Sequence, residues 1–228
     1  MSQGTFIAIE GGDGSGKATQ AALLVEYLNS EQGFSAIKIS FPRYGEASAY
    51  YAGKYLDGAY GSVNDVSADL ASLAYAVDRF AAKDNIESKL KERNGFVVAD
   101  RYVASNLAHQ GAKIANDKER AAFYDQTMLT EYDILKIPRP SKNIVLLTPV
   151  GLSQANVDKK DASTRSYTDK KRDIHEADSS HLEKAKANYE ELCRLYPDEF
   201  ISINCADDMG NMRSITDIQS DIRTILNL

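Results

Sequence analysis

Short apolar runs alternate along the chain with longer segments of helical periodicity. The runs are apolar nearly throughout, which is typical of strands buried on both faces of a sheet. The segments between them carry apolar residues three and four positions apart, which predicts amphipathic helices. This alternation predicts an α/β fold in which helices flank a parallel sheet. The five candidate strands are Phe6–Ile9, Ala36–Phe41, Phe96–Ala99, Asn143–Leu147 and Phe200–Asn204.

Cap residues and periodicity together place the helices. Ser67 is a suitable N-cap for a segment that reaches about residue 93, and this length indicates a bend. Within that segment, Leu70, Leu73 and Val77 fall at helical spacing. The predicted helices span residues 17–30, 50–60, 67–93, 117–132, 183–195 and 214–226.

The first strand leads through a glycine-rich loop into a helix. The loop fits the phosphate-binding pattern G-x-x-x-x-G-K-[ST] except at its last position. Glycines let backbone N–H groups converge on phosphate oxygens, the helix N-terminus adds its positive dipole end, and Lys17 supplies a mobile charge. A chance glycine-rich turn is the alternative interpretation. The predicted phosphate site comprises Gly11, Gly12, Asp13, Gly14, Ser15, Gly16, Lys17, Ala18 and Thr19.

The last position of the pattern is Ala18, where a hydroxyl would bind Mg²⁺. Thr19 does not substitute for it, because the next residue on a helix points about 100° away. The sequence therefore predicts phosphate binding and leaves hydroxyl-assisted metal binding open.

Charged residues follow the second and third strands. Arg43 and Tyr44 follow the second, and Asp100 and Arg101 follow the third. Catalytic groups in parallel sheets gather at the carboxyl ends of the strands. There Asp100 is placed to hold Mg²⁺ and Arg101 to bind a phosphate. The alternatives are a turn cap for Asp100 and a surface ion pair for Arg101.

Asp78 and Arg79 interrupt an apolar helix face. Adjacent helix residues do not face each other, so each needs its own partner. Tyr75 lies one turn before Arg79, and such a pair is suited to grip a base by stacking and by a hydrogen bond to a carbonyl. A core tyrosine beside a surface arginine is the alternative, and both stay open.

A polar, basic stretch lies between Pro149 and Asp178. Over a phosphate site such a stretch is suited to act as a lid, here at about residues 150–178, that excludes water and presents cations. A solvated charged surface is the equally plain alternative. Its cations are Lys159, Lys160, Arg165, Lys170, Lys171 and Arg172.

Composition narrows the class of protein. The length of 228 residues suits one domain, and a net charge of -6 argues against nucleic acid as a partner. Cys193 and Cys205 lack metal-ligand spacing, which indicates a reducing compartment. His175 and His181 show no metal-ligand pattern and are expected at the surface or in the lid. With neither a signal peptide nor a membrane-spanning run visible, we predict a cytoplasmic protein without a membrane partner.

These motifs, in this order and spacing, resemble the thymidylate kinase family over essentially the whole chain. The matching stretches are residues 9–17, 41–45, 55–61, 75–79, 100–106, 108–111 and 173–176. The resemblance implies a three-layer P-loop kinase fold with a five-stranded parallel sheet and a basic lid, as one domain over residues 1–228. It also implies transfer of a phosphoryl group from ATP to dTMP with Mg²⁺, usually in a homodimer.

The resemblance implies roles residue by residue. Lys17 and the loop amides would hold the ATP phosphates, Asp13 would meet the sugar 3′-hydroxyl or the metal region, and adenine would lie near residues 206–209. Tyr75 would stack on thymine, Arg79 would reach its O4, and Asn106 would contact its N3 edge. The implied substrate-binding set is Asp13, Phe41, Pro42, Arg43, Tyr44, Tyr75, Arg79, Arg101, Asn106, His109 and Gln110.

Members of the family carry a catalytic arginine either beside the aspartate of the loop or in the lid, and the chain departs from the family pattern at two other positions, 18 and 109. Position 14 is glycine, so the catalytic arginine of the lid would be Arg165 or Arg172, beside Lys17 and Arg101. Ala18 leaves Mg²⁺ to Asp13, Asp100, water and the phosphates. His109 stands where the family commonly has tyrosine near the sugar 2′ position, which bears on discrimination against ribonucleotides.

Two other functions compete with this one. A different P-loop kinase would prefer another nucleoside or nucleotide. A regulatory protein whose metal site had decayed at Ala18 would bind ATP without turnover, but it would not need Lys17, Asp100, Arg101 and the basic stretch together.

Overall fold

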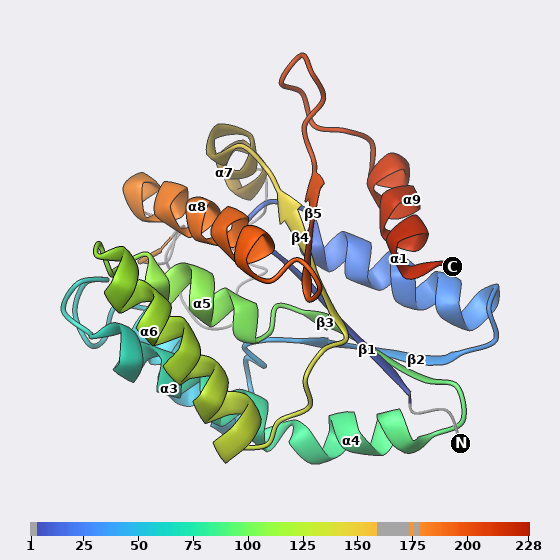
Figure 1. Cartoon of the computed structure of the whole chain (residues 1–228), viewed down its shortest axis with the longest axis horizontal. Coiled ribbons are helices and arrows are strands. Elements are labelled where there is room, and N and C mark those ends of the chain that lie inside the picture. The colour runs from blue at the N-terminus through green and yellow to red at the C-terminus, as the bar shows by residue number, and fades with distance from the viewer. Residues whose placement is uncertain (1–3, 159–173, 176–177) are drawn as a thin grey trace.

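A parallel sheet forms the centre of the computed structural model, which describes residues 4–158, 174–175 and 178–228. Within these residues the sheet has five strands in the order β2-β3-β1-β4-β5 (Figure 1). All five predicted strands are confirmed to within two residues at either end. The strands are β1 (Thr5–Gly11), β2 (Ser35–Ser40), β3 (Gly95–Asp100), β4 (Lys142–Leu147) and β5 (Phe200–Asn204).

Helices connect the strands, as their alternation predicted. The predicted helix over residues 17–30 is confirmed, whereas α5 and α7 were not predicted. A π-helical turn, Leu129–Ile134, follows α6 where a continuous helix was expected. The helices are α1 (Lys17–Ser30), α2 (Tyr50–Leu56), α3 (Ala68–Ala81), α4 (Lys83–Lys91), α5 (Val103–Gly111), α6 (Asp117–Met128), α7 (Val150–Asp158), α8 (Ser179–Leu195) and α9 (Ile215–Leu226).

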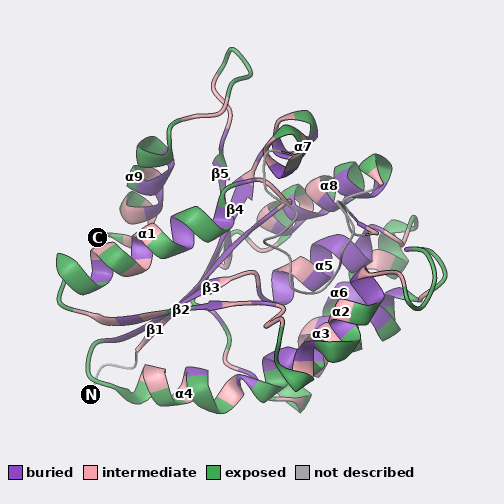
Figure 2. Cartoon of the chain, turned by 180° about the vertical axis from the view of Figure 1, so that it is seen from behind, coloured by how far each residue is buried: buried purple, intermediate pink, exposed green. Residues whose placement is uncertain are grey.

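Each face of the sheet carries its own apolar core. Side chains alternate along β1, so Ile7 and Ile9 pack with α1 and α9, while Phe6 and Ala8 pack with α4, α5 and α8. Figure 1 shows the two helical layers on opposite sides of the strands, and Figure 2 shows the strands largely buried between them. The architecture is the expected three-layer α/β fold.

The long segment predicted over residues 67–93 is two helices that meet at Ala82, so the predicted bend is confirmed. The Ser67 side chain accepts a hydrogen bond from the Leu70 N–H at 3.3 Å, as its N-cap position predicts. The stripe containing Leu70, Leu73 and Val77 faces outward, with exposed fractions of 63%, 48% and 47%. The opposite face of α3 is buried and includes polar side chains, so apolar spacing located the helix without identifying its inner face.

The carboxyl ends of β1, β2 and β3 bring three loops to one edge of the sheet. Ile9 pairs with Asp100 across β1 and β3, and Ser40 pairs with Asp100 across β2 and β3. The loops that begin at residues 12, 41 and 101 therefore start side by side. None of the helices in the described part of the chain is long and apolar enough to span a membrane.

Candidate active site

The glycine-rich loop turns sharply between β1 and α1. Gly11, Gly14 and Gly16 have φ values of 136°, 77° and 93°, a region that side chains with a Cβ disfavour. A Cβ at Gly14 would lie 2.1 Å from the carbonyl oxygen of Ser153 in α7. The Asn156 side-chain amide also donates to the Gly14 carbonyl at 3.1 Å. The first part of the segment predicted as a lid thus packs as a helix against the loop.

Lys17 opens α1, and its side chain folds back over the loop. Its Nζ donates to the Gly12 carbonyl oxygen at 2.6 Å. Burial and the nearby Arg101 guanidinium lower the pKa of Lys17 to about 8, against the opposing charges of Asp13 and Asp100. A phosphate would replace the Gly12 carbonyl as the partner of this ammonium group and would favour its charged form.

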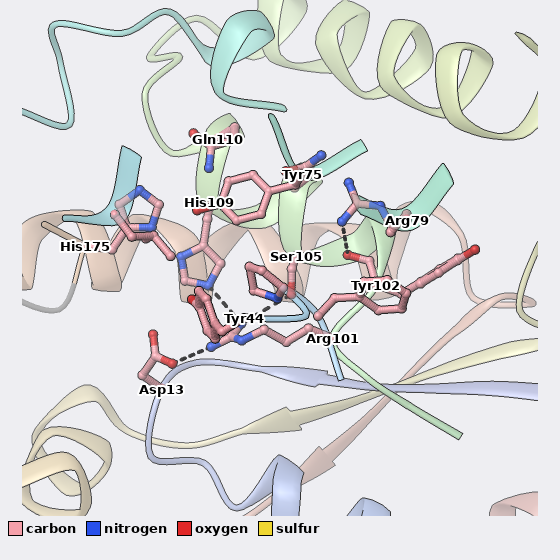
Figure 3. Close-up of a pocket in the computed structure, with 14 residues that line it drawn as sticks. Asp13, Tyr44, Tyr75, Arg79, Arg101, Tyr102, Ser105, His109, Gln110 and His175 are labelled. Carbon is pink, nitrogen blue, oxygen red and sulfur yellow. Dashed lines mark hydrogen bonds and ion pairs between the residues drawn. The ribbon is translucent and has the colours of Figure 1, made fainter. Parts of the chain in front are cut away.

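Arg101 lies between the loop and the rest of the site. It has a φ of 68°, and its N–H donates to the Ile9 carbonyl at 3.0 Å, which turns the side chain back toward β1. Its guanidinium forms an ion pair with Asp13 (Figure 3). It also donates to the Gly11 carbonyl at 3.2 Å. Burial would raise the pKa of Asp13, but the charges of Arg101 and Lys17 hold it far below its usual value.

Glu10 supports this turn from below. Its buried carboxylate accepts from the Tyr102 N–H at 2.6 Å, from the Ser105 hydroxyl at 2.7 Å and from the Tyr189 hydroxyl at 3.1 Å. Burial raises the pKa of Glu10, although these donors and Arg101 favour the ionised form. The Glu10 carboxylate therefore links the end of β1 to the turn after β3, to α5 and to α8.

A cavity of about 190 Å³ opens beside Arg101. Figure 3 shows Tyr75, Arg79 and His109 directed toward it from α3 and α5. Tyr75 and Arg79 share this cavity, as their one-turn spacing predicted. The lining residues are Asp13, Phe41, Pro42, Tyr44, Leu56, Tyr75, Arg79, Arg101, Tyr102, Ser105, Asn106, His109, Gln110 and His175.

Arg79 is buried, so the alternative of a surface arginine is wrong. Both ends of its guanidinium bind the Glu131 carboxylate, with the Nε donating at 2.7 Å. The Asn106 side-chain amide donates to the same carboxylate at 3.1 Å. Burial lowers the pKa of Arg79, but Glu131 raises it further, so the guanidinium stays charged. One acidic side chain thus fixes the two predicted base-reading residues.

Asp78 has a separate partner, as its position beside Arg79 predicted. It binds the Arg43 Nε at 2.9 Å and the Arg43 N–H at 2.6 Å. The Arg43 guanidinium also donates to the Ser48 hydroxyl at 2.8 Å. Arg43 does not line the cavity, although it was predicted to bind substrate. Its bonds to Asp78 instead hold the loop that carries Pro42 and Tyr44.

The loop lines a second cavity, with walls from α1 and from the hairpin after β5. Asp13 and Arg101 line both cavities, so the two open toward each other at this ion pair. Arg165 and Arg172 lie outside the described residues. The second cavity is lined by Asp13, Gly14, Ser15, Gly16, Lys17, Ala18, Thr19, Gln20, Asp100, Arg101, Asn156, Met212, Arg213, Ile215 and Ile218.

The structure contradicts the expectation that two of the histidines lie at the surface. His175 and His181 are buried rather than at the surface, and they lie against His109. Sequence reasoning also missed Glu131 and Glu10. Glu10 directly precedes the glycine-rich loop, which is a local signal, whereas Glu131 has none because its partner lies 52 residues away.

The strand, loop, lysine and helix, with a separate cavity beside Arg101 that adjoins the loop cavity, define the chain as a P-loop kinase. The thymidylate kinase family model matches residues 9–215. A thymidylate kinase from Mycobacterium tuberculosis is 32% identical over 194 residues, which cover 82% of this chain and 85% of that protein. The chain belongs to the thymidylate kinase family, whose members are ATP-dependent nucleoside monophosphate kinases that convert dTMP to dTDP.

More distant proteins extend the likeness to the whole chain. A probable thymidylate kinase from Pyrococcus horikoshii is 28% identical over 220 residues, which cover 96% of this chain and 94% of that protein. The structure of a thymidylate kinase from Candida albicans superposes with a TM-score of 0.67 at 21% identity, covering 100% of this chain and 93% of that one. One from Ehrlichia chaffeensis has a TM-score of 0.68 at 18% identity, covering 99% and 100%.

Proposed function

We propose that the two cavities are the donor and acceptor sites of a dTMP kinase. The observation that carries this proposal is that Asp13 and Arg101 line both cavities. A nucleotide whose phosphates lie on the loop and a monophosphate in the cavity lined by Tyr75 and Arg79, here called the acceptor cavity, would meet at Arg101. Positioning of this kind accounts for most of the catalysis in phosphoryl transfer.

Charge neutralisation is the main task of the protein in this reaction. An oxygen of the dTMP phosphate attacks the γ-phosphorus of ATP, and the bond from that phosphorus to the β,γ-bridging oxygen breaks to release ADP. Lys17 and the loop amides bind the donor phosphates, and Arg101, with Tyr44, binds the acceptor phosphate. Arg165 and Arg172 remain our candidates for a lid arginine over the transferred group. The acceptor oxygen is itself the nucleophile, so no protein nucleophile is needed.

The acceptor base would enter between Tyr75, Arg79 and Asn106. Stacking on the Tyr75 ring is worth roughly 1–3 kcal/mol. Arg79 would donate to the O4 carbonyl, and the thymine N3–H would donate to the side-chain oxygen of Asn106, whose amide hydrogens already bind Ser72 and Glu131. Cytosine offers an amino donor in place of O4 and an acceptor at N3, so this arrangement would distinguish the two bases. Phe41, Pro42 and Gln110 complete the walls of this cavity.

The loop cavity also fits Mg²⁺. Asp13 and Asp100 supply the carboxylate oxygens that this ion prefers, and both line the cavity that contains Lys17. Asp13 is already paired with Arg101, so we assign Asp100 the main role in binding Mg²⁺. Water and phosphate oxygens would take the place of the hydroxyl that Ala18 lacks. When bound, Mg²⁺ would neutralise charge on the donor phosphates.

We also propose that two copies associate through the outer face of α3. Leu70, Leu73, Val77 and Phe80 expose about half or more of their side chains on this one helix, an unusual concentration for a monomer. Sedimentation should give the mass of a dimer for the natural chain and of a monomer for Leu73→Asp. Leu195→Asp, at the exposed end of α8, is the matched control and should stay dimeric. A natural chain that sediments as a monomer would contradict this proposal.

A coupled assay of ADP release tests the main proposal. With Mg·ATP as donor, the acceptors are dTMP, dUMP, UMP, dCMP and thymidine. We expect turnover with dTMP on the order of 1–100 s⁻¹, well above the others. Preference for another acceptor would indicate a different P-loop kinase, and ATP binding without turnover would favour the regulatory alternative. One kinase domain over residues 1–228 and a cytoplasmic location remain predictions from the sequence.

A further inference from the structure

Three buried histidines meet behind the acceptor cavity. His109 lies on α5, His175 precedes α8, and His181 is in its first turn, and each exposes about 5% or less. The ring centroids of His109 and His175 are 5.6 Å apart, those of His175 and His181 are 4.5 Å apart, and those of His109 and His181 are 5.9 Å apart. One ring nitrogen of each residue lies within 4.8 Å of those of the other two.

Burial favours the neutral form of all three imidazoles. Burial lowers the pKa of His181 to about 4, and burial holds the pKa values of His109 and His175 well below the usual range. The neighbouring cations Arg101 and Lys113 act in the same direction. A neutral imidazole keeps one nitrogen lone pair, which is the form that binds a metal ion.

Two of the rings have a buried nitrogen with no hydrogen-bond partner among the described residues. These atoms are the Nδ1 of His109 and the Nε2 of His181. A buried polar atom left without a partner costs stability, and its usual explanation is a water or an ion that completes its contacts. Here two such atoms belong to rings of one cluster, which indicates a common partner between them.

The third ring is oriented from outside the cluster. The His175 Nε2 lies 3.0 Å from the Tyr55 hydroxyl, and the two rings meet edge to face. This contact orients the His175 ring, and ligand histidines in metal sites are commonly oriented by such a contact outside the ligand set.

We propose that His109, His175 and His181 form a binding site for a divalent d-block ion such as Zn²⁺. Three imidazoles with a fourth position for water are a known zinc donor set, with Zn–N bonds of about 2.0–2.1 Å. Tetrahedral ligation at that bond length needs the nitrogens about 3.3 Å apart, so modest side-chain rotation would close the cluster around the ion. Mg²⁺ prefers oxygen ligands and would not compete for this site.

The site would be linked to the acceptor cavity, because His109 and His175 line both. An ion held there would draw these two rings inward and change the wall that faces the sugar. The Arg101 guanidinium can only donate to the His109 Nε2, 3.5 Å away, so it favours the tautomer with the proton on Nδ1. An ion bound at Nδ1 would release that proton and would also meet the charge of Arg101, although the pairing of Arg101 with Asp13 reduces this opposition. We therefore expect weaker binding than in a closed structural zinc site.

Binding of the metal ion alone tests the inference, independently of kinase activity. The chain, prepared without a polyhistidine tag and stripped of metal, is titrated with Co²⁺ while its visible absorption is recorded. The natural chain contains only three histidines, so histidine-dependent binding can arise only from this cluster. We expect one equivalent of Co²⁺ with the intense bands of tetrahedral ligation, displaced by Zn²⁺ and unaffected by excess Mg²⁺.

Variants and a spectroscopic measurement complete the test. His181→Ala should abolish the bands, and Cys193→Ser with Cys205→Ser should leave them unchanged, because the two thiols are the competing soft ligands. On the natural chain, Zn²⁺ should shift the ¹H–¹³C ring signals of all three histidines together, which needs no variant to fold. Absence of uptake by the natural chain, or ring signals that do not move, would overturn the proposal.

Discussion

The loop after β1 and the acceptor cavity meet at Arg101, yet they are built in different ways. The loop is made of backbone from one short stretch, with glycines at positive φ and a single lysine folded over it. The acceptor cavity depends on ion pairs between elements that are distant in sequence, such as Arg79 with Glu131. A local motif therefore supplies the phosphate-binding part of the donor site, whereas the base-binding part of the acceptor site depends on long-range partners.

Loss of the loop lysine should give the largest kinetic effect. Lys17→Ala removes the cation that faces the donor phosphates, so we expect kcat to fall by about 10²–10³-fold, the loss typical of one electrostatic contact to the transition state. The KM for dTMP should change far less, because Lys17 is absent from the acceptor cavity. Steady-state kinetics with each substrate varied in turn measure this split. A selective rise in the KM for dTMP would show that the role assigned to Lys17 is wrong.

Loss of the buried acid should act on the acceptor site. Glu131→Gln leaves the Arg79 guanidinium without its counter-charge, which typically costs about 3–5 kcal/mol of folding free energy. Because Glu131 also orients Asn106, we expect the KM for dTMP to rise by about tenfold or more, with a smaller change in the KM for ATP.

Another ion pair provides the control for Glu131→Gln. Glu191 binds Arg120 at 2.9 Å and lies outside the acceptor cavity. Glu191→Gln should cost about 1 kcal/mol or less and leave both KM values unchanged. Equal KM values for dTMP in the two variants would show that Glu131 supports the fold without positioning the base-reading residues.

The donor site should also show its own pH dependence. The pKa of Lys17 is lowered to about 8, so its ammonium group is charged below that pH and loses its proton as the pH rises through it. We expect kcat/KM for ATP to fall above about pH 8, since this ratio reports the free enzyme. Bound phosphates favour the charged form, so kcat should hold to higher pH. A kcat/KM profile that stays flat to pH 10 would contradict the assigned pKa direction.

Substrate preference should show the smallest effect. His109→Tyr introduces the residue that the resemblance to the family implies near the sugar 2′ position, so we expect a few-fold sharper preference for dTMP over UMP, about 1 kcal/mol. The ratio of kcat/KM values for the two substrates measures this preference. An unchanged ratio would remove His109 from the discrimination between deoxyribose and ribose.

The sequence was most informative where structure is local. The β1 strand, the loop and the whole of α1 follow from contiguous apolar, glycine and lysine signals, and the bounds of α1 were predicted to the residue. The partner of Glu131 could not be predicted, because a π-helical turn sets the direction of its side chain and 52 residues separate it from Arg79. The spacing of apolar residues in α3 located the helix, but it did not show that the apolar stripe is the exposed face.

The histidines illustrate the same limit. His109 and His181 lie 72 positions apart and come together only because α5 packs along α8. Metal-ligand motifs are recognised in sequence when ligands share one turn or loop, and these do not. The burial of these histidines also depends on tertiary packing. The polar composition of the sequence around His175 and His181 therefore predicted a surface position for them, which is wrong.

Arg101 adopts a backbone conformation with a φ of 68°, which costs of order 1 kcal/mol or more for a residue other than glycine. Folding alone would favour glycine or asparagine at this position, so the arginine is held there by its chemistry. Thermal selection and selection for turnover would therefore rank substitutions at position 101 in opposite orders. Stability-guided or consensus redesign of this protein should therefore leave Arg101 unchanged, because substitutions there that raise thermal stability would lower turnover.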